Sequence, residues 1–244
     1  MKASLTKRSP QEIKKIFNSI ALNYDRANKA ITLGMDSWWR KKLVKWSEAP
    51  LDGKILDCAT GTGVLAFEFQ KQLGPKAQIT AVDFCEGMLK QAYNKVNSSS
   101  ISPKNIDFQT ADVQELPFQD NKYDVCAMAY GLRNVEDPIK TLMEMARITK
   151  KGGTVMILET GDRPMFLLYP LFYLYFRFIV PRIGGWLTGQ KSAYEYLQKS
   201  SQNFPSRHSL LTLMDKTKCF SECQYKTLFF GSSFIYKARV SKEH

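Results

Sequence analysis

Apolar residues in the middle of the chain follow two alternating spacings. Short apolar runs, typical of buried strands, recur at 54–59, 78–84, 106–112, 123–130 and 152–160. Between them, apolar residues fall at the i, i+3, i+4 spacing of a helix at 64–73, 86–96 and 137–150. Strands that alternate with helices predict a mostly parallel sheet with helices on both faces. The pattern therefore predicts a doubly wound, Rossmann-like α/β fold.

The chain begins with a helical region that precedes this alternation. Residues 10–48 carry helical spacing, and the start signals are clear. Ser9 is placed to cap the first helix, Pro10 fits its first turn, and Glu12 completes a capping box with Ser9. The sequence therefore predicts N-terminal helices in front of the sheet.

The chain ends with a different arrangement. After residue 160 come an aromatic segment and a polar stretch, which predict a helical insertion, and then a helix near 206–218. Two strands follow at 223–231 and 232–240, and Gly231 and Ser232 suit a tight hairpin between them. The sheet is therefore expected to end with one antiparallel strand.

Charge and cysteine content indicate which partners and which cellular compartment to expect. Lys and Arg number 35 against 23 Asp and Glu, a formal net charge of +12. This excess favours anionic partners such as phospholipid headgroups or nucleic acid, although a solvated surface is the alternative. The five cysteines are odd in number and follow no signal peptide, which favours a reducing, cytoplasmic setting. With only two histidines, the chain offers no metal site at a recognised spacing.

The longest apolar stretch, at 165–180, is too short to cross a membrane. Pro170 interrupts it and Arg177 follows, whereas a spanning helix needs about 20 apolar residues. Its many Phe and Tyr residues suit a membrane interface or an apolar substrate pocket. A helix packed on the sheet is the alternative.

A glycine-rich turn follows the first predicted strand. "ATGTGVLA" at 59–66 fits the G-x-G-x-x-A pattern, in which Gly61 and Gly63 let the backbone approach a ligand. Asp83 ends the next strand, where a carboxylate accepts ribose hydroxyls. Because no Lys and Ser or Thr of a P-loop follow the glycines, ATP is not expected. The pattern alone leaves a plain tight turn as the alternative.

Two further acids bear on the choice between a nicotinamide dinucleotide and S-adenosylmethionine. Asp57 ends the first strand and Asp112 ends the third. A sulfonium ligand with a free ammonium group is cationic, so nearby acids favour it over a pyrophosphate. Asp112 could reach the adenine amino group, or it could simply cap a turn.

Several longer motifs extend over nearly the whole chain and carry a family resemblance. They are "IFNSIALNYDRANKAITLGMDSWWRKK", "LDCATGTG", "AVDF", "TADVQELPFQDNKYDV", "GLRNV", "KKGGTVMILE" and "YEYLQKSSQNFP". Together they resemble the S-adenosylmethionine-dependent C-methyltransferases of ubiquinone and menaquinone biosynthesis. The resemblance covers roughly residues 10–235. It implies a class I methyltransferase fold and methyl transfer to a ring carbon of a demethylated polyprenyl quinol.

The resemblance also implies an organisation for the whole chain, 1–244, as a single methyltransferase domain. Residues 1–50 would form a helical cover and 51–160 the cofactor-binding core. The segment 161–205 would be an aromatic insertion facing substrate or membrane, and 206–244 would close the sheet with a helix and strands.

Matching motifs assign site residues by the same resemblance. The residues that hold or line the S-adenosylmethionine pocket would be Gly61, Thr62, Gly63, Asp83, Met88, Asp112, Val113 and Ala129. Asp57 is added to this set for its negative charge beside a cationic ligand. Tyr24 and Asp25, in "NYD", would belong to the helical cover, and a helix end packed on the core is their alternative. Two departures are expected to lower cofactor affinity: Val64 stands where the family usually has an acid, and Ala129 where it usually has a serine.

Arg133 and Tyr24 are the candidate catalytic residues. Methyl transfer to carbon needs an electron-rich ring, and ionising a ring hydroxyl supplies it. Arg133, in "GLRN", would stabilise the phenolate as a permanently protonated guanidinium. The alternative for Arg133 is a salt bridge to Glu136 or Asp137. "LETGDRP" keeps Glu159 but differs from the commoner "LEFSKP", which leaves the ring substrate open.

The expected partners follow from that chemistry. A demethylmenaquinol is favoured over the benzoquinol of ubiquinone biosynthesis, and its polyprenyl tail implies peripheral contact with the inner face of the membrane. A homodimer is possible and nucleic acid is not expected. The competing interpretations are a nicotinamide oxidoreductase on the same fold, a basic RNA methyltransferase and a non-catalytic membrane-binding scaffold.

Overall fold

The computed structural model describes residues 8–98, 105–161 and 174–241. Within them, seven strands form one sheet in the order β3-β2-β1-β4-β5-β7-β6. The strands are β1 (Lys54–Cys58), β2 (Gln78–Asp83), β3 (Ile106–Thr110), β4 (Tyr123–Ala129), β5 (Thr149–Thr160), β6 (Phe220–Leu228) and β7 (Ser233–Val240).

Strands β1 to β5 are parallel, and β7 alone among the described strands runs the other way. It pairs antiparallel with β5 on one side and with β6 on the other. The predicted doubly wound sheet with one antiparallel strand is therefore confirmed. The order reverses between β1 and β4, and at such a switch point two loops diverge and leave room for a ligand.

The hairpin between β6 and β7 is wider than the predicted tight turn. β6 ends at Leu228 and β7 begins at Ser233, with a 3₁₀ turn, η4 (Phe229–Gly231), between them. Phe229 and Phe230 both have positive φ angles, 34° and 55°, which lets the chain reverse within this longer connection. The prediction of a tight Gly231–Ser232 hairpin was wrong because strand pairing stops before the two phenylalanines.

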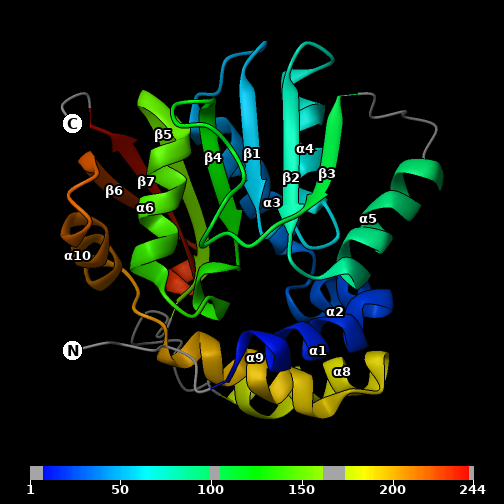
Figure 1. Ribbon diagram of the computed structural model, residues 1–244. Coiled ribbons are helices and arrows are strands. Elements are labelled where there is room, and N and C mark those ends of the chain that lie inside the picture. The colour runs from blue at the N-terminus through cyan, green and yellow to red at the C-terminus, as the bar shows by residue number, and fades with distance from the viewer. Residues whose placement is uncertain (1–7, 99–104, 162–173, 242–244) are drawn as a thin grey trace.

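Helices cover both faces of the sheet (Figure 1). On one face lie α3 (Met35–Ser47), α4 (Val64–Leu73) and α5 (Glu86–Ser98), and on the other lie α6 (Pro138–Ile148) and α10 (His208–Lys216). Each face has its own apolar core. Ile55 packs with Leu43 and Phe69 on the first face, whereas its neighbour Leu56 packs with α6 residues on the second. Adjacent strand residues thus supply opposite cores, as pleating requires.

A third layer of helices lies beyond the carboxyl ends of the parallel strands (Figure 1). It contains α1 (Pro10–Ile20), η1 (Ala21–Asn23), α2 (Tyr24–Ile31), the π-helical turn η3 (Tyr175–Ile179), α8 (Val180–Thr188) and α9 (Lys191–Asn203). The predicted capping box is present, since Ser9 and Glu12 exchange both hydrogen bonds. Ile20, Met88 and Tyr194 join these helices to α5 in a small apolar core. This layer therefore covers the edge where ligands bind.

The aromatic segment at 165–180 falls largely outside the described residues. Its last part, from Leu174 onward, forms η3 and the start of α8. In the parts of the chain that the structure describes, no helix has the length and apolar character needed to cross a membrane.

Candidate functional site

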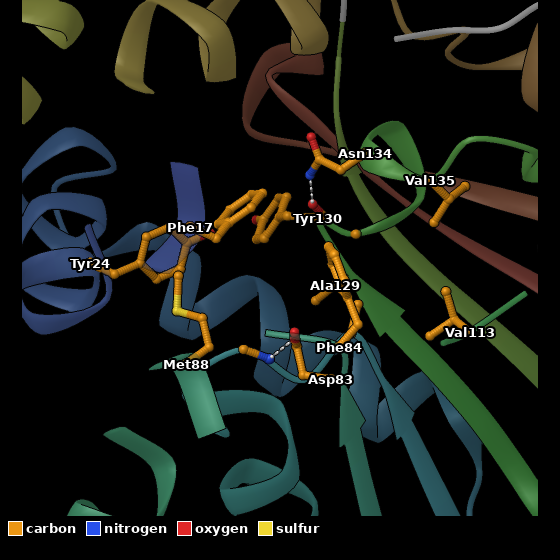
Figure 2. A pocket seen from close by; sticks show the side chains of 13 residues that line it. Phe17, Tyr24, Asp83, Phe84, Met88, Val113, Ala129, Tyr130, Asn134 and Val135 are labelled. Carbon is orange, nitrogen blue, oxygen red and sulfur yellow. Dashed lines mark hydrogen bonds between the residues drawn. The ribbon is translucent and has the colours of Figure 1, made fainter. Parts of the chain in front are cut away.

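A pocket opens where β1, β2 and β4 end, beneath α1 and α2 (Figure 2). Its volume is about 570 Å³ including space open to solvent, within the range of small-molecule sites. It is lined by Phe17, Tyr24, Ala59, Gly61, Asp83, Phe84, Met88, Val113, Ala129, Tyr130, Gly131, Asn134 and Val135. We call it the cofactor pocket, after the cofactor that the sequence leads us to expect at this edge of the sheet.

The floor of the cofactor pocket is built from backbone in an unusual conformation. Ala59 directly follows β1 and Tyr130 directly follows β4, and their φ angles are 49° and 60°. Non-glycine residues rarely adopt this left-handed region. A Cβ added to Gly131 would lie 2.8 Å from Cβ of Ala59, so the two strand ends approach as closely as a glycine permits. Such strain collects at binding sites.

Asp83 is fixed at the end of β2 by two backbone amides. The Gly61 amide donates to Oδ2 over 2.7 Å, and the Cys85 amide donates to Oδ1 over 2.8 Å. Burial raises the pKa of Asp83 to about 6, while the amides favour its ionised form. Each oxygen keeps a lone pair for another donor. Gly61 has a φ of 59°, and a Cβ there would meet nothing within 4 Å, so its backbone borders open space.

Three other predicted residues stabilise the glycine turn through contacts on its far side and are not among the residues that line the pocket. A Cβ on Gly63 would lie 3.0 Å from the rings of Phe67 and Phe108, so this glycine allows close packing. Thr62 points its hydroxyl at Asp25. Asp57 is buried and accepts the hydroxyl of Thr60, 2.5 Å away. Burial raises the pKa of Asp57 to about 7.

Asp25 fastens α2 to the glycine turn. Its Oδ1 accepts from the Thr62 hydroxyl over 2.6 Å, and its Oδ2 is paired with the ammonium group of Lys95 on α5. Lys95 also donates to the carbonyl oxygen of Thr62 over 2.8 Å. These contacts join α2, the glycine turn and α5 at one point, which we call the cover latch.

The remaining cofactor candidates divide between the pocket and the surface. Met88 and Val113 face the cofactor pocket from opposite sides, with Ala129 at the end of β4 (Figure 2). Asp112 is exposed and accepts the amide of Gln114 over 2.9 Å, the turn-capping role given as its alternative. Of the eleven predicted site residues, the structure brings six together here: Tyr24, Gly61, Asp83, Met88, Val113 and Ala129.

A second pocket adjoins the first and shares part of its wall. It has a volume of about 640 Å³, again including open space. Its lining residues are Tyr24, Asn28, Ile31, Thr32, Asp36, Trp39, Arg40, Tyr130, Arg133, Thr160, Tyr194, Leu197, Gln198 and Ser201. Tyr24 and Tyr130 line both pockets. We call the second one the ring pocket, after the ring substrate that the sequence resemblance leads us to expect.

Arg133 lines the ring pocket as half of a buried ion pair. Its Nη1 lies 2.5 Å from Oε2 of Glu159 on β5, and its backbone amide donates to Oε1 over 3.2 Å. Burial opposes the charge, but the Glu159 carboxylate raises the pKa of Arg133. The alternative of a salt bridge to Glu136 or Asp137 was wrong in its partner, because Arg133 pairs with Glu159 and Asp137 caps α6. Arg133 therefore stays a fixed cation at this wall.

Two motifs that lie far apart in the sequence meet beside these pockets. Asn134 of "GLRN" accepts a hydrogen bond from the hydroxyl of Tyr196 of "YEYL" over 3.2 Å. It also donates to the carbonyl oxygen of Tyr130 over 3.1 Å (Figure 2). The hydroxyls of Thr160 and Ser201 lie 2.6 Å apart. Helix α9 is therefore bonded to the strand ends that form the site.

Sequence reasoning missed several lining residues. Phe84 and Tyr130 each adjoin a predicted residue, and that proximity was the available signal for them. Phe17, on α1, lies within the quoted N-terminal motif, but no residue of that helix was assigned to the pocket. Arg40 and Asp36 lie within the quoted N-terminal motif, but nothing in their spacing indicated that they face a cavity.

Comparison with known proteins gives consistent matches. Residues 5–239 match the model of the ubiE/COQ5 methyltransferase family. The chain is 46% identical over 232 residues to the ubiquinone/menaquinone biosynthesis C-methyltransferase UbiE of Bdellovibrio bacteriovorus, covering 95% of this chain and 97% of that protein. It is 34% identical to the demethylmenaquinone methyltransferase of Bacteroides fragilis, covering 95% and 93%.

Solved structures share the fold at lower identity. A SAM-dependent methyltransferase from Thermotoga maritima has a TM-score of 0.62 at 19% identity, covering 93% of this chain and 99% of that one. Another from Aquifex aeolicus has a TM-score of 0.59 at 18% identity, covering 96% and 100%. The seven-stranded sheet is thus the class I methyltransferase sheet.

Proposed function

Because the chain belongs to the ubiE/COQ5 methyltransferase family, we propose that it methylates a ring carbon of a demethylated polyprenyl quinol, with demethylmenaquinol as the favoured substrate. The chain is an S-adenosylmethionine-dependent methyltransferase. The observation that carries the proposal is the pair of adjoining pockets whose shared wall is Tyr24 and Tyr130. The benzoquinol of ubiquinone biosynthesis is the alternative substrate, since one relative is named for both quinones.

The cofactor pocket has the groups that S-adenosylmethionine needs. The open space beside Gly61 accommodates a ligand against bare backbone, and Asp83 keeps free lone pairs for the ribose hydroxyls. Met88, Val113 and Ala129 provide apolar walls. Asp57, Thr62 and Gly63 act by holding the glycine turn in position. When bound, S-adenosylmethionine supplies an electrophilic methyl group.

The ring pocket supplies the charge that makes the acceptor carbon nucleophilic. A ring hydroxyl placed beside Arg133 loses its proton more readily, because the guanidinium stabilises the phenolate that results. Arg133 itself stays protonated, so it is an electrostatic stabiliser and not a base. Glu159 keeps the guanidinium in place through its bonds to Nη1 and the backbone amide. Tyr24, on the shared wall, orients the ring toward the cofactor pocket.

Methyl transfer in vitro tests the function directly. The purified full chain is mixed with S-adenosylmethionine and either chemically reduced demethylmenaquinone or a demethylated polyprenyl benzoquinol in lipid vesicles. Mass spectrometry is expected to show a gain of one methyl group on the naphthoquinol ring, with little product from the benzoquinol. A benzoquinol product in excess would select the alternative substrate. No methylated quinol of either kind would contradict the proposal.

Peripheral membrane contact is the second part of the proposal. Leu33 and Trp186 are 77% and 85% exposed, and Leu174, Phe178 and Ile179 are also exposed. The Tyr175 hydroxyl donates to the Ile31 carbonyl oxygen over 2.7 Å, which ties this apolar group to α2 beside the ring pocket. Exposed cations on α2 and α8, Arg26, Lys29 and Arg182, complement anionic headgroups. A lipid-tailed substrate would enter from this side.

Vesicle flotation tests that contact. The wild-type chain is expected to float with vesicles, and more so as anionic lipid content rises. The double variant Leu33→Ser and Trp186→Ser is expected to lose most of this binding. Leu51→Ser is the matched control, since Leu51 is 65% exposed but precedes β1 at the opposite end of the sheet. Equal flotation of all three chains, or none with any lipid, would reject this docking surface.

A further inference from the structure

We infer that Arg40 is a second substrate-binding cation, which holds the ring oxygen para to the one beside Arg133. The inference rests on the proposed function, because it assigns a contact to the same quinol. It makes the ring pocket selective for aromatic diols over otherwise similar phenols.

The wall of the ring pocket contains unused hydrogen-bond donors. In the described ranges, eight buried side-chain polar atoms have no hydrogen-bond partner. Half of them belong to residues that line this one pocket: Trp39 Nε1, Tyr130 Oη, Arg133 Nε and Tyr194 Oη. Buried polar groups are rarely left unpaired in folded proteins, and each of these four groups carries a hydrogen to donate. Their concentration marks the surroundings of this pocket as unusually polar for a protein interior.

Arg40 is a buried cation at the same wall. Only 8% of it is exposed, and its Nη1 lies 2.5 Å from Oδ2 of Asp36, one turn earlier on α3. Asp36 is itself held by the Thr32 hydroxyl, 2.9 Å from Oδ1. Among the described residues the bond to Asp36 is the one that the Arg40 side chain makes, so most of its five N–H donors stay available.

A purely structural role explains this pair poorly. Burying two charges costs about as much as their attraction returns, so an apolar pair would serve stability as well. The cost is understandable if the guanidinium faces a ligand. Asp36 and Arg40 both line the ring pocket, as that explanation requires.

Arg40 and Arg133 flank a single aromatic ring. The guanidinium carbon of Arg40 lies 5.4 Å from the centroid of the Tyr130 ring, and that of Arg133 lies 5.5 Å from it. Each arginine has its own carboxylate, Asp36 or Glu159. The ring pocket is thus lined by two cations, each fixed by its own carboxylate and each close to the Tyr130 ring.

A quinol matches two cations because its two hydroxyl oxygens lie at opposite positions of the ring. The oxygen beside Arg133 becomes the phenolate that activates the neighbouring carbon. That carbon would form a bond to the methyl group as the methyl–sulfur bond of S-adenosylmethionine breaks and leaves a thioether. The ring carbon would then give its proton to water, which restores the aromatic ring. Arg40 exchanges no bond in this step. It donates to the second oxygen and thereby fixes which ring carbon faces the cofactor pocket.

Two substrates separate this role from a structural one. One is a short-chain demethylated naphthoquinol, and the other is the matching naphthol that keeps the hydroxyl next to the acceptor carbon and lacks the para hydroxyl. The wild-type chain is expected to prefer the diol in kcat/KM by about 10- to 100-fold, the range for a hydrogen bond to a charged group. Arg40→Gln is expected to lose most of that preference while its activity on the naphthol changes little.

Further variants sharpen the comparison. Arg40→Lys keeps the positive charge but loses the planar guanidinium with its paired N–H donors, so the preference for the diol is expected to fall to an intermediate value. Lys41→Gln is the matched control, because it removes one cation from the exposed neighbouring position. It is expected to leave kcat/KM unchanged for both substrates. Arg133→Ala is expected to lower turnover of both substrates alike. Melting temperature and S-adenosylhomocysteine binding establish that each variant is folded.

Several results would overturn the assignment. They are equal kcat/KM for the two substrates in the wild-type chain, a preference that survives in Arg40→Gln, or an equal loss on both substrates in that variant. If Arg40→Gln does not fold, the test rests on the ratio of kcat/KM for the diol to that for the naphthol, measured in the wild-type chain and in Arg40→Lys. Transfer to neither compound by the wild-type chain would instead overturn the proposed function, and this inference with it.

Discussion

Tyr196 on α9 donates its hydroxyl hydrogen to Oδ1 of Asn134, 3.2 Å away in the turn after β4. Asn134 lines the cofactor pocket and also holds the carbonyl oxygen of Tyr130. A side chain from the helical insertion thereby controls the shape of a strand end. Helix α9 is therefore part of the site's construction as well as of the helical layer beyond the strand ends.

Tyr196→Phe should loosen this connection. The change removes one hydrogen bond and leaves Asn134 Oδ1 without that partner, a loss of about 1 kcal/mol. We expect S-adenosylhomocysteine to bind a few-fold more weakly, measured by calorimetry. Tyr225→Phe is the control, because Tyr225 lies on β6 beside His208 of α10, away from both pockets. Equal affinities for the wild-type and Tyr196→Phe chains would contradict the role given to this bond.

The cover latch predicts that Asp25→Asn weakens cofactor binding. The change removes the charge that pairs with Lys95 and weakens the bond from Thr62, so the closed position of α2 becomes less populated. We expect roughly a 3- to 10-fold rise in the dissociation constant for S-adenosylhomocysteine. Glu86→Gln is the matched control, since the Lys14–Glu86 pair also joins the N-terminal helices to α5 but lies away from the glycine turn. A larger effect from Glu86→Gln would refute the latch.

Gly131→Ala should destabilise the chain through crowding alone. Gly131 has an ordinary φ of −95°, but its new Cβ would lie 2.8 Å from Ala59 Cβ and 2.9 Å from Met128 Cγ. Overpacking of this kind costs about 1–3 kcal/mol, which corresponds to a fall in melting temperature of about 2–10 °C. Adding Ala59→Gly removes one of the crowding atoms and should restore part of the loss. If this second change restores no stability, crowding against Ala59 is not the cause of the destabilisation.

Arg133→Ala should lower kcat far more than it lowers cofactor affinity. Without the guanidinium, the ring hydroxyl loses its stabilising charge, and loss of one such group costs about 100- to 1000-fold. The change also leaves Glu159 buried without its partner, so stability should fall as well. Single-turnover rates on folded protein separate these effects. An unchanged turnover number would remove Arg133 from the mechanism.

Cofactor binding should depend on pH through Asp83. Burial raises the pKa of this carboxyl from 3.8 to about 6. The folded chain therefore binds a proton that the unfolded chain releases between these values, so this group's contribution to stability falls as pH rises through about 6. The ribose hydroxyls favour the ionised carboxylate as their acceptor. Affinity for S-adenosylhomocysteine should thus rise from pH 5 to pH 7 and then level off.

Calorimetry across that range, with Asp83→Asn beside the wild-type chain, checks this prediction. The amide cannot ionise, so the rise near pH 6 should disappear. Asp57 is the other buried carboxyl of the turn with a raised pKa, about 7. Any rise that persists in Asp83→Asn would belong to Asp57 or another group, and an undiminished rise would exclude Asp83.

The fold was largely predictable because its determinants are local. Alternating apolar spacings gave the strands and helices, and the residues at 9–12 gave the first capping box. The β6–β7 connection was not predictable, because two phenylalanines with positive φ have no sequence signal. The division of the chain into cover, core and insertion stays a prediction.

The site was predictable in its chemistry but not in its contacts. Asp83 and Gly61 could be paired from their motifs, since both follow strand ends at one edge. The Arg133–Glu159 pair joins residues 26 positions apart, and it depends on the side-by-side placement of β4 and β5. Tyr130 and Arg40 line one cavity although they lie 90 positions apart in the sequence. Contacts of this kind follow from strand order and helix placement, which spacing along a chain does not encode.

The two tyrosines that border both pockets have a thermodynamic consequence. A ligand that repositions Tyr24 or Tyr130 alters the neighbouring cavity, and linkage then requires each ligand to change the other's affinity by the same factor. The thioether product in one pocket would therefore change the affinity of the other pocket for the methylated ring. A single molecule spanning both cavities would gain from their proximity, which makes this boundary the natural point to join the halves of a bisubstrate inhibitor.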